Sequence, residues 1–212
     1  MLEEFIRHKT EILTVIKDIE ALTEKESSET DDRLLAVREQ LISNSFNLVI
    51  LGQFKRGKTT LINSLIGKEI LPSSVVPLTS IVTILKFGEE VRCSIYMEDE
   101  SEKEVGIEEL SDYVTEKGNP KNVRGVRCAR IDYPSSFLEQ GMLLVDTPGV
   151  GSTFLHNTET TYNFLDHLDA ALFLMSADVP ISQAEKELLD TIKGSTQKIF
   201  FVLNKIDNLT TE

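Results

Sequence analysis

The sequence of 212 residues contains few cysteines, no tryptophan and no long hydrophobic run. Its two cysteines, Cys93 and Cys128, form no Cys-x-x-Cys pair and have no histidine cluster nearby, so a disulfide framework or a zinc site has no support. The longest apolar stretch, Ala170–Met175, is far below the ~18 residues that cross a bilayer, and the first residues lack a signal-peptide layout. These absences predict a cytoplasmic protein.

Positive charge is also scarce, because 22 Lys and Arg residues stand against 35 Asp and Glu residues, a net charge of −13. A surface of this sign argues against broad binding to anionic membranes or nucleic acid, and we expect no nucleic-acid partner. The charge is uneven: residues 44–95 carry six basic and three acidic side chains, whereas residues 96–118 carry two and nine. The single basic stretch is therefore suited to a bound polyanion.

The spacing of apolar residues indicates two helices followed by alternating strands and helices. Apolar positions recur every three or four residues over 2–24 and again over 34–42, which predicts two amphipathic N-terminal helices. Later apolar runs of buried-strand type are FNLVIL, GMLLVD, AALFLMSA and KIFFVLN, with helical stretches at 157–168 and 181–193. This alternation predicts an α/β fold with a mostly parallel sheet and helices on both faces.

A glycine-rich loop, GQFKRGKTT, joins the first of these runs to a helical stretch. It matches G-x-x-x-x-G-K-[ST], in which main-chain N–H groups surround phosphate oxygens, the lysine bridges the outer phosphates and the hydroxyl binds Mg²⁺. The strand before the loop and the helix after it are the context that this pattern requires. The predicted nucleotide contacts here are Gly52, Gln53, Lys55, Arg56, Gly57, Lys58, Thr59 and Thr60.

The motif DTPG follows the apolar run GMLLV. A carboxylate at the end of a sheet strand, here Asp146, can hold Mg²⁺ through water. Gly149 has no side chain in the way, so its N–H group can meet a terminal phosphate. The motif therefore predicts a second contact with phosphate and metal.

The motif NKID follows the apolar run KIFFVL. The Asp207 carboxylate has two acceptor oxygens for the N1–H and N2–H₂ donors of guanine, whereas adenine offers no matching donor pair on that edge. The stem of Lys205 can cover the base, and the side chain of Asn204 can tie this segment to the phosphate loop. The motif therefore favours GTP over ATP.

The loop LPSSVVPLTSIVTIL lies between the first helix of the α/β region and the next strand. A GTPase needs one hydroxyl in such a loop that reaches Mg²⁺ and the terminal phosphate only while that phosphate is present. Thr79 is our choice, with Ser80 as the alternative. The predicted metal set is therefore Thr59, Thr79 and Asp146.

The segments GQFKRGKTTLINSLIGKEILPSSVVPLTS, DTPGVGS and FFVLNKID together resemble the GTPase domain of the dynamin superfamily, and most closely its bacterial dynamin-like members. The resemblance implies a P-loop GTPase domain over residues 45–212 and a helical bundle or neck that includes residues 1–44. It also implies Mg²⁺-dependent turnover of GTP to GDP, homodimerisation through the GTPase heads, and coupling to membrane remodelling. Nucleotide-site roles then transfer to Lys58, Thr59, Thr79, Asp146, Gly149, Asn204, Lys205 and Asp207.

The phosphate loop departs from the family at one position. Where the dynamins that define the family have a glutamine that orients the attacking water, this chain has Phe54, which cannot orient water by hydrogen bonding. In the guanylate-binding proteins, the position that matches Lys55 holds an arginine that stabilises transition-state charge. Lys55 or Arg56 is therefore the candidate for an additional catalytic cation, beside Lys58 and Thr79.

The chain ends five residues after Asp207. The resemblance predicts that the remaining helices and strand of the domain, the stalk and the membrane-binding tip lie outside this chain, as in a piece of a longer protein or one product of a split gene. Binding to the inner face of a membrane would then depend on those parts. Two alternatives stay open: a ribosome- or RNA-associated GTPase, which the acidic charge disfavours, and a nucleotide-dependent interaction module without turnover.

Overall fold

The computed structural model describes residues 2–23, 34–35, 37–38, 41–42, 45–72, 79–139, 141–149 and 168–209. The chain divides into two compact units, Met1–Phe46 and Asn47–Glu212. The helix expected over 157–168 falls outside the described residues except for its last position. Within the described ranges, no helix is both long enough and apolar enough to cross a membrane.

The first unit contains one long helix, α1 (Leu2–Thr23). Positions 34–35, 37–38 and 41–42 are also helical. On α1, Ile16 is buried, whereas Val15 is 56% exposed. The predicted first helix is therefore present, and its place in a helical bundle stays a prediction.

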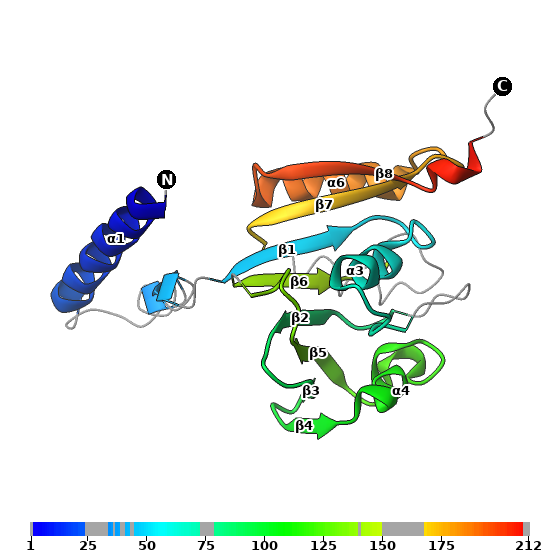
Figure 1. The fold of residues 1–212 in the computed structure, drawn as a ribbon, viewed down its shortest axis with the longest axis horizontal. Helices are drawn as coiled ribbons and strands as arrows, with labels where there is room; N and C mark the ends of the chain where they lie inside the picture. Colours follow the sequence, from blue (N-terminus) through cyan, green and yellow to red (C-terminus); the bar gives the residue numbers. More distant parts are fainter. Residues whose placement is uncertain are drawn as a thin grey trace. The chain divides into compact units, whose positions relative to one another are not determined.

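The second unit is built on one eight-stranded sheet. Its strands are β1 (Phe46–Leu51), β2 (Thr83–Phe87), β3 (Arg92–Met97), β4 (Glu102–Val105), β5 (Val126–Tyr133), β6 (Met142–Asp146), β7 (Ala170–Ser176) and β8 (Ile199–Asn204). They lie side by side in the order β4-β3-β5-β2-β6-β1-β7-β8 (Figure 1). Among the described residues of this unit, the helices are α3 (Lys58–Ile66), α4 (Ser111–Val114) and α6 (Gln183–Ser195), with 3-10 turns η1 (Ile107–Glu109), η2 (Pro120–Asn122) and η4 (Ile206–Asn208).

The sheet is mixed, which corrects the expectation of a mostly parallel one. β7 runs parallel to β1 and to β8, and β5 runs parallel to β2. β2 is antiparallel to β6, and β3 is antiparallel to both β4 and β5. Only a short turn joins β3 to β4, and a parallel pair would need a crossover of a dozen or more residues. The α/β class is confirmed, with the parallel pairs of β7 at one end of the sheet.

Both faces of the central strands are covered. Val49 and Leu51 of β1 share one face with Phe173 of β7, and Leu188 and Ile192 of α6 pack against them. Because side chains alternate along a strand, the intervening residues of β1 point to the opposite face. Figure 1 shows α3 in front of the sheet and α6 behind it, as the expectation of helices on both faces requires.

Two helices follow the neighbouring strands β1 and β7. β1 leads through the glycine-rich loop into α3, and β7 leads through residues 177–182 into α6. Ser182 caps α6: its hydroxyl accepts from the Glu185 N–H, and the Glu185 carboxylate accepts from the Ser182 N–H. The starts of α3 and α6 therefore lie beside each other, at the edge where parallel sheets place their functional groups.

Candidate nucleotide site

The loop from Gly52 to Gly57 leaves the end of β1 and turns directly into α3. Gly52 and Gly57 have φ angles of 145° and 92°. A Cβ at Gly52 would lie 2.6 Å from the main-chain oxygen of Leu174, and a Cβ at Gly57 would collide with the side-chain nitrogen of Asn204. Both positions require glycine, for the backbone angle and for the close approach of β7 and of Asn204 at the end of β8.

Lys58 begins α3, and its side chain turns back into the loop. Its Nζ donates hydrogen bonds to the main-chain oxygens of Gly52 at 3.1 Å and Gln53 at 3.3 Å. Burial lowers the pKa of Lys58 to about 8, although Asp146 and Glu185 favour the charged form. A buried ammonium that donates to two carbonyls is well placed to bind an anion inside the loop.

The three residues of the predicted metal set converge on one point. The Thr59 Oγ1 donates to Asp146 Oδ2 at 2.8 Å, and the Thr79 Oγ1 donates to the same oxygen at 3.3 Å. The two threonine oxygens are 3.5 Å apart. The Asp146 Oδ1 is buried and has no hydrogen-bond partner among the described residues.

This oxygen set fits Mg²⁺, which prefers carboxylate and hydroxyl ligands together with phosphate oxygens and water. Burial raises the pKa of Asp146, against the opposing effects of Lys58 and of the Thr59 and Thr79 hydroxyls. A nearby cation would relieve that burial penalty by favouring the charged carboxylate. Elsewhere in the described residues, no group of three or more His, Cys, Asp and Glu side chains could hold a metal ion.

Thr79 and Ser80 point to different neighbours. Thr79 faces Asp146 and also forms an isolated β-bridge with Thr115, just after α4. The N–H and hydroxyl of Ser80 both donate to the main-chain oxygen of Val114, at 2.9 and 3.3 Å. The geometry therefore favours Thr79 over Ser80 as the switch hydroxyl.

Gly149 packs directly on the phosphate loop. A Cβ at Gly149 would lie 2.6 Å from the main-chain nitrogen of Phe54. Nearby, the Thr147 hydroxyl donates to the main-chain oxygen of Ile50 at 2.8 Å, which joins the segment after β6 to β1. The Nζ of exposed Lys55 lies 5.3 Å from the centre of the Phe54 ring. At the tip of the loop, Phe54 thus lies beside Gly149, and Lys55 lies over the Phe54 ring.

Arg56 does not face this site with its side chain, which corrects its candidacy as a catalytic cation. The residue is 2% exposed, and all five N–H donors of its guanidinium are used. They reach Glu185 Oε1 at 2.8 Å, Glu185 Oε2 at 2.7 Å, Ser176 Oγ at 2.6 Å, and the main-chain oxygens of Val179 and Pro180 at 2.9 Å each. No donor is left for a phosphate, and Lys55 stays as the candidate cation.

Glu185, on α6, accepts hydrogen bonds from two residues of the phosphate loop. Its Oε1 accepts from Arg56 and from the Gln53 N–H at 3.3 Å, and its Oε2 accepts from Arg56 and from the Ser182 N–H at 2.9 Å. Burial alone would raise the pKa of Glu185, but the hydrogen bonds from Arg56 and Ser182 outweigh it and lower the pKa. The Gln53 N–H, predicted to meet nucleotide, is therefore directed at Glu185.

The predicted base-reading residues lie at the end of β8 and just after it. The Asn204 side-chain nitrogen donates to the main-chain oxygen of Arg56 at 2.9 Å, which is the expected tie to the phosphate loop. Lys205 has a φ of 56°, and its Nζ lies 3.7 Å from Asp178 Oδ2 in the segment after β7. Asp207 is exposed in η4. The three residues thus lie at or just beyond the end of β8, the strand beside β7, at the same edge of the sheet as the phosphate loop.

Comparison with known proteins matches residues 48–206 to the sequence model of the Dynamin family. The chain belongs to this family. A solved structure from work on an oligomerised bacterial dynamin pair, concerned with long-range sensing and tethering of membranes, is also similar. That likeness has a TM-score of 0.66 at 27% identity and covers 95% of this chain and 32% of the other. Residues 48–206 are therefore a dynamin-type GTPase domain.

Two relatives place the domain among bacterial sequences. An uncharacterized protein in the xynA 3' region of Caldicellulosiruptor sp. (strain Rt8B.4) is 42% identical over 208 residues, 98% of this chain and 50% of that protein. The bacterial dynamin-like protein of Nostoc punctiforme is 32% identical over 175 residues, 77% of this chain and 25% of that protein. The chain thus spans half the length of the first relative and a quarter of the second.

The dynamin-type domain uses Glu185 in a way that its sequence does not reveal. Ser182 and Glu185 form the pattern S-x-x-E, which signals the start of a helix. That signal predicts the cap of α6, but it contains nothing about Gln53 or Arg56, which are more than 120 residues away along the chain. Only the fold brings the cap against the phosphate loop.

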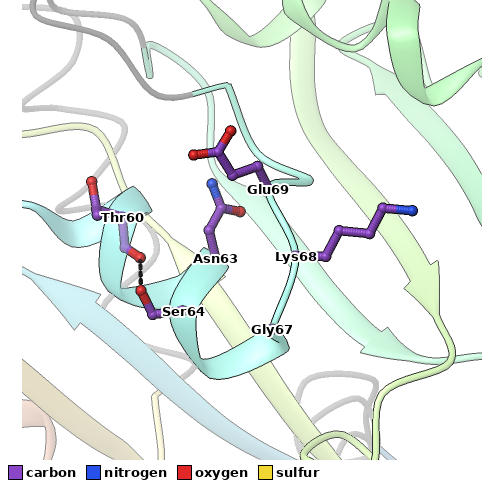
Figure 2. Close-up of a pocket in the computed structure, with 6 residues that line it drawn as sticks. All are labelled: Thr60, Asn63, Ser64, Gly67, Lys68 and Glu69. Atoms are coloured by element: carbon purple, nitrogen blue, oxygen red, sulfur yellow. Dashed lines mark hydrogen bonds between the residues drawn. The ribbon is translucent and has the colours of Figure 1, made fainter.

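A separate hollow of about 350 Å³ lies beside α3 (Figure 2). It is lined by Thr60, Asn63, Ser64, Gly67, Lys68 and Glu69. The Asn63 amide already makes hydrogen bonds to the main chain. Its nitrogen donates to Leu71 O at 2.8 Å, and its oxygen accepts from the N–H groups of Ile70 and Leu71. Thr60, predicted to contact nucleotide, lines this hollow, whereas Lys58 and Thr59 do not.

Proposed function

We propose that this domain binds GTP and GDP together with Mg²⁺ and hydrolyses GTP to GDP and inorganic phosphate. The observation that supports this best is the convergence of Thr59, Thr79 and Asp146 beside Lys58. A buried cation for phosphate and an oxygen set for Mg²⁺ are the two elements that phosphoryl transfer requires.

The residues divide the work at the phosphate end. Lys58 and the main-chain N–H groups at the start of α3 bind phosphate oxygens, and Gly149 meets the terminal phosphate. Thr59, Thr79 and Asp146 would hold Mg²⁺. When bound, Mg²⁺ neutralises charge on the transferred phosphoryl group. Thr79 is the proposed switch hydroxyl, because it reaches the same centre as Thr59.

The base end selects guanine. Asp207 accepts from the two guanine donors, and Lys205 covers the base with its aliphatic stem. Asn204 supports this arrangement through its hydrogen bond to Arg56 O. This division predicts that GTP and GDP bind in preference to adenine nucleotides.

A binding and turnover measurement tests the proposed function. Fluorescent GDP and ADP analogues would be titrated in the presence of MgCl₂, and phosphate release from GTP would be followed with MgCl₂ and with excess EDTA. We expect guanine preference and Mg²⁺-dependent phosphate release. Equal affinity for adenine and guanine nucleotides would contradict the proposal.

Lys55 supplies the additional cation for the transition state in this proposal. It is exposed at the tip of the phosphate loop, has a φ of 67° and lies beside the Phe54 ring. Removal of one such charge-stabilising group typically slows the chemical step ~100-fold or more. We expect Lys55→Ala to reduce single-turnover hydrolysis by about that factor while GTP affinity changes little. Lys68→Ala, an exposed lysine beyond α3, is the matched control, and equal rates for the two variants would reject the role.

A nucleotide-dependent interaction module without turnover is the second candidate, and Phe54 is the observation that favours it. If Phe54 leaves no group to orient water, GTP would bind and remain intact. The same phosphate-release measurement separates the candidates, since tight guanine binding without release of phosphate supports the second.

For the longer protein, we propose nucleotide-dependent pairing of GTPase heads and action at a membrane through parts outside this chain. The similarity to a bacterial dynamin described as an oligomerised pair that senses and tethers membranes supports this. Turnover per molecule that rises with protein concentration would support head pairing. A constant specific activity over a hundredfold concentration range would argue against it.

A further inference from the structure

We propose that Arg56 and Glu185 form a positioning pair that holds the phosphate loop in its nucleotide-binding conformation without either side chain contacting the nucleotide. The proposal rests on the guanine-nucleotide site proposed above. It differs from that proposal because it assigns a function to two charged side chains that point away from the ligand.

The pair is fully buried and fully hydrogen-bonded. Arg56 is 2% exposed and Glu185 0%, and the Nη2 to Oε2 distance is 2.7 Å. Taking either charge out of water is unfavourable unless its hydrogen bonds are satisfied. The five donors of Arg56 and four acceptor positions of Glu185 are all used, so the pair can adopt few other geometries.

The contacts of the pair fix the phosphate loop at both ends. Glu185 accepts from the Gln53 N–H at the beginning of the loop. At the end of the loop, just before α3, the side chain of Arg56 is held by Glu185. The main-chain N–H of Arg56 donates to Gln53 O at 3.3 Å. Phe54 and Lys55 lie between these two anchors. The loop therefore keeps its shape through contacts with Glu185 as well as through the hydrogen bonds that Lys58 donates to Gly52 and Gln53.

The same pair reaches the base end. Arg56 donates to the main-chain oxygens of Val179 and Pro180, in the segment that also carries Asp178. Asp178 Oδ2 lies 3.7 Å from the Nζ of Lys205. The Arg56 main-chain oxygen accepts from Asn204. One buried residue thus connects the phosphate loop to the two segments that support base recognition.

Glu185→Gln tests the pair with almost no change in shape. The amide nitrogen of glutamine would confront N–H donors that the carboxylate now accepts, so the loop should lose at least one anchor. Groups that orient ligands from behind typically affect affinity by about 10- to 100-fold, as at metal sites. We expect affinity for GDP and for a non-hydrolysable GTP analogue to fall by at least about tenfold, and by the same factor for both.

A double variant separates positioning from stability. Arg56→Met combined with Glu185→Leu removes both buried charges and leaves none unpaired, a replacement that often preserves or raises stability. We expect the double variant to unfold at a temperature near that of the unchanged chain but to remain weak in binding. Recovery of tight GDP binding in this variant would overturn the proposal, because the pair would then matter only for stability.

Ile192→Ala is the control for general destabilisation. Ile192 is buried on α6 against the sheet and belongs to neither end of the site. We expect a lower unfolding temperature with an unchanged Kd for GDP at temperatures where the variant is folded. Unchanged affinity in Glu185→Gln under the same conditions would reject the positioning role.

Hydrogen exchange of the Gln53 amide provides a readout without nucleotide. Because Glu185 accepts from this N–H, we expect slow exchange in the unchanged chain and at least tenfold faster exchange in Glu185→Gln, with core amides of β1 unaffected. Equal exchange rates would overturn the proposal. If exchange accelerates but the unchanged chain binds no guanine nucleotide, the pair orders the loop and the proposed function fails instead.

Discussion

The phosphate end and the base end of the proposed site are built differently. At the phosphate end, Lys58 and Asp146 are 8% and 1% exposed, and their contacts join α3, β6 and the loop after β1. At the base end, Asp207 follows β8, the last strand in the sheet, whose Phe200 is 56% exposed. The residues proposed to bind phosphate and Mg²⁺ are therefore part of the buried core, whereas the residue proposed to recognise the base follows a strand at the edge of the sheet.

Paired substitutions in β7 and β8 give the largest expected effect. Phe173 of β7 is 1% exposed, and its ring contacts that of Phe201 on β8, which is 56% exposed. We expect Phe173→Ala to reduce the free energy of unfolding by about 3–5 kcal/mol, because it empties a buried site. Phe201→Ala should cost less than about 1 kcal/mol. Urea unfolding of both variants checks this, and equal losses would contradict the contrast between core and edge.

Lys58→Ala removes the cation at the phosphate end. Truncation of one partner of a buried charge pair typically costs about 2–5 kcal/mol, so GDP affinity should fall roughly 30-fold or more. The fold should survive, because the change also removes a buried charge. Titration with fluorescent GDP measures the effect, with Lys68→Ala as the control. A loss for both lysines alike would show general charge attraction instead of a specific contact.

Asp207→Asn changes the base end alone. Two well-directed hydrogen bonds to a base edge contribute about 1–3 kcal/mol of discrimination, so the preference for GDP over ADP should shrink by about 5- to 150-fold. Affinity for ADP should not fall, because the phosphate contacts remain. Competition titrations measure the ratio, and Asp190→Asn, an exposed change on α6, is the control. A parallel loss for both nucleotides would place Asp207 outside base recognition.

The pH dependence of binding is the smallest predicted effect. Burial places the pKa of Lys58 at about 8 in the free protein, and a bound phosphate should raise it, because an anion favours the ammonium. Binding above pH 8 is then coupled to proton uptake, so GDP affinity should fall as the pH rises. The decrease should approach tenfold per pH unit, or about 1.4 kcal/mol. Titrations between pH 7 and 9 measure it, and constant affinity would contradict the assigned pKa.

The sequence predicts the contacts of short motifs better than it predicts the contacts between them. The glycine loop, DTPG and NKID each imply their own chemistry, and the tie from Asn204 to the phosphate loop is present. The motifs do not predict the mixed sheet, because the relative direction of two strands depends on which strands pair, and no single motif contains that information. Arg56 resembles a solvated basic residue next to Lys55 until Glu185, 129 residues later, is placed against it.

The exposed edge of β8 bears on how association of this chain is measured. Among the described strands β8 has a neighbour on one side only, so its outer N–H and C=O groups can pair with another chain. Phe200 and Phe201 of β8, which point to opposite faces of the sheet, are also each 56% exposed. Self-association through β8 would not depend on which nucleotide is bound, whereas pairing of GTPase heads would. Comparing the association state with GTP and with GDP therefore distinguishes self-association through β8 from nucleotide-dependent pairing of the GTPase heads.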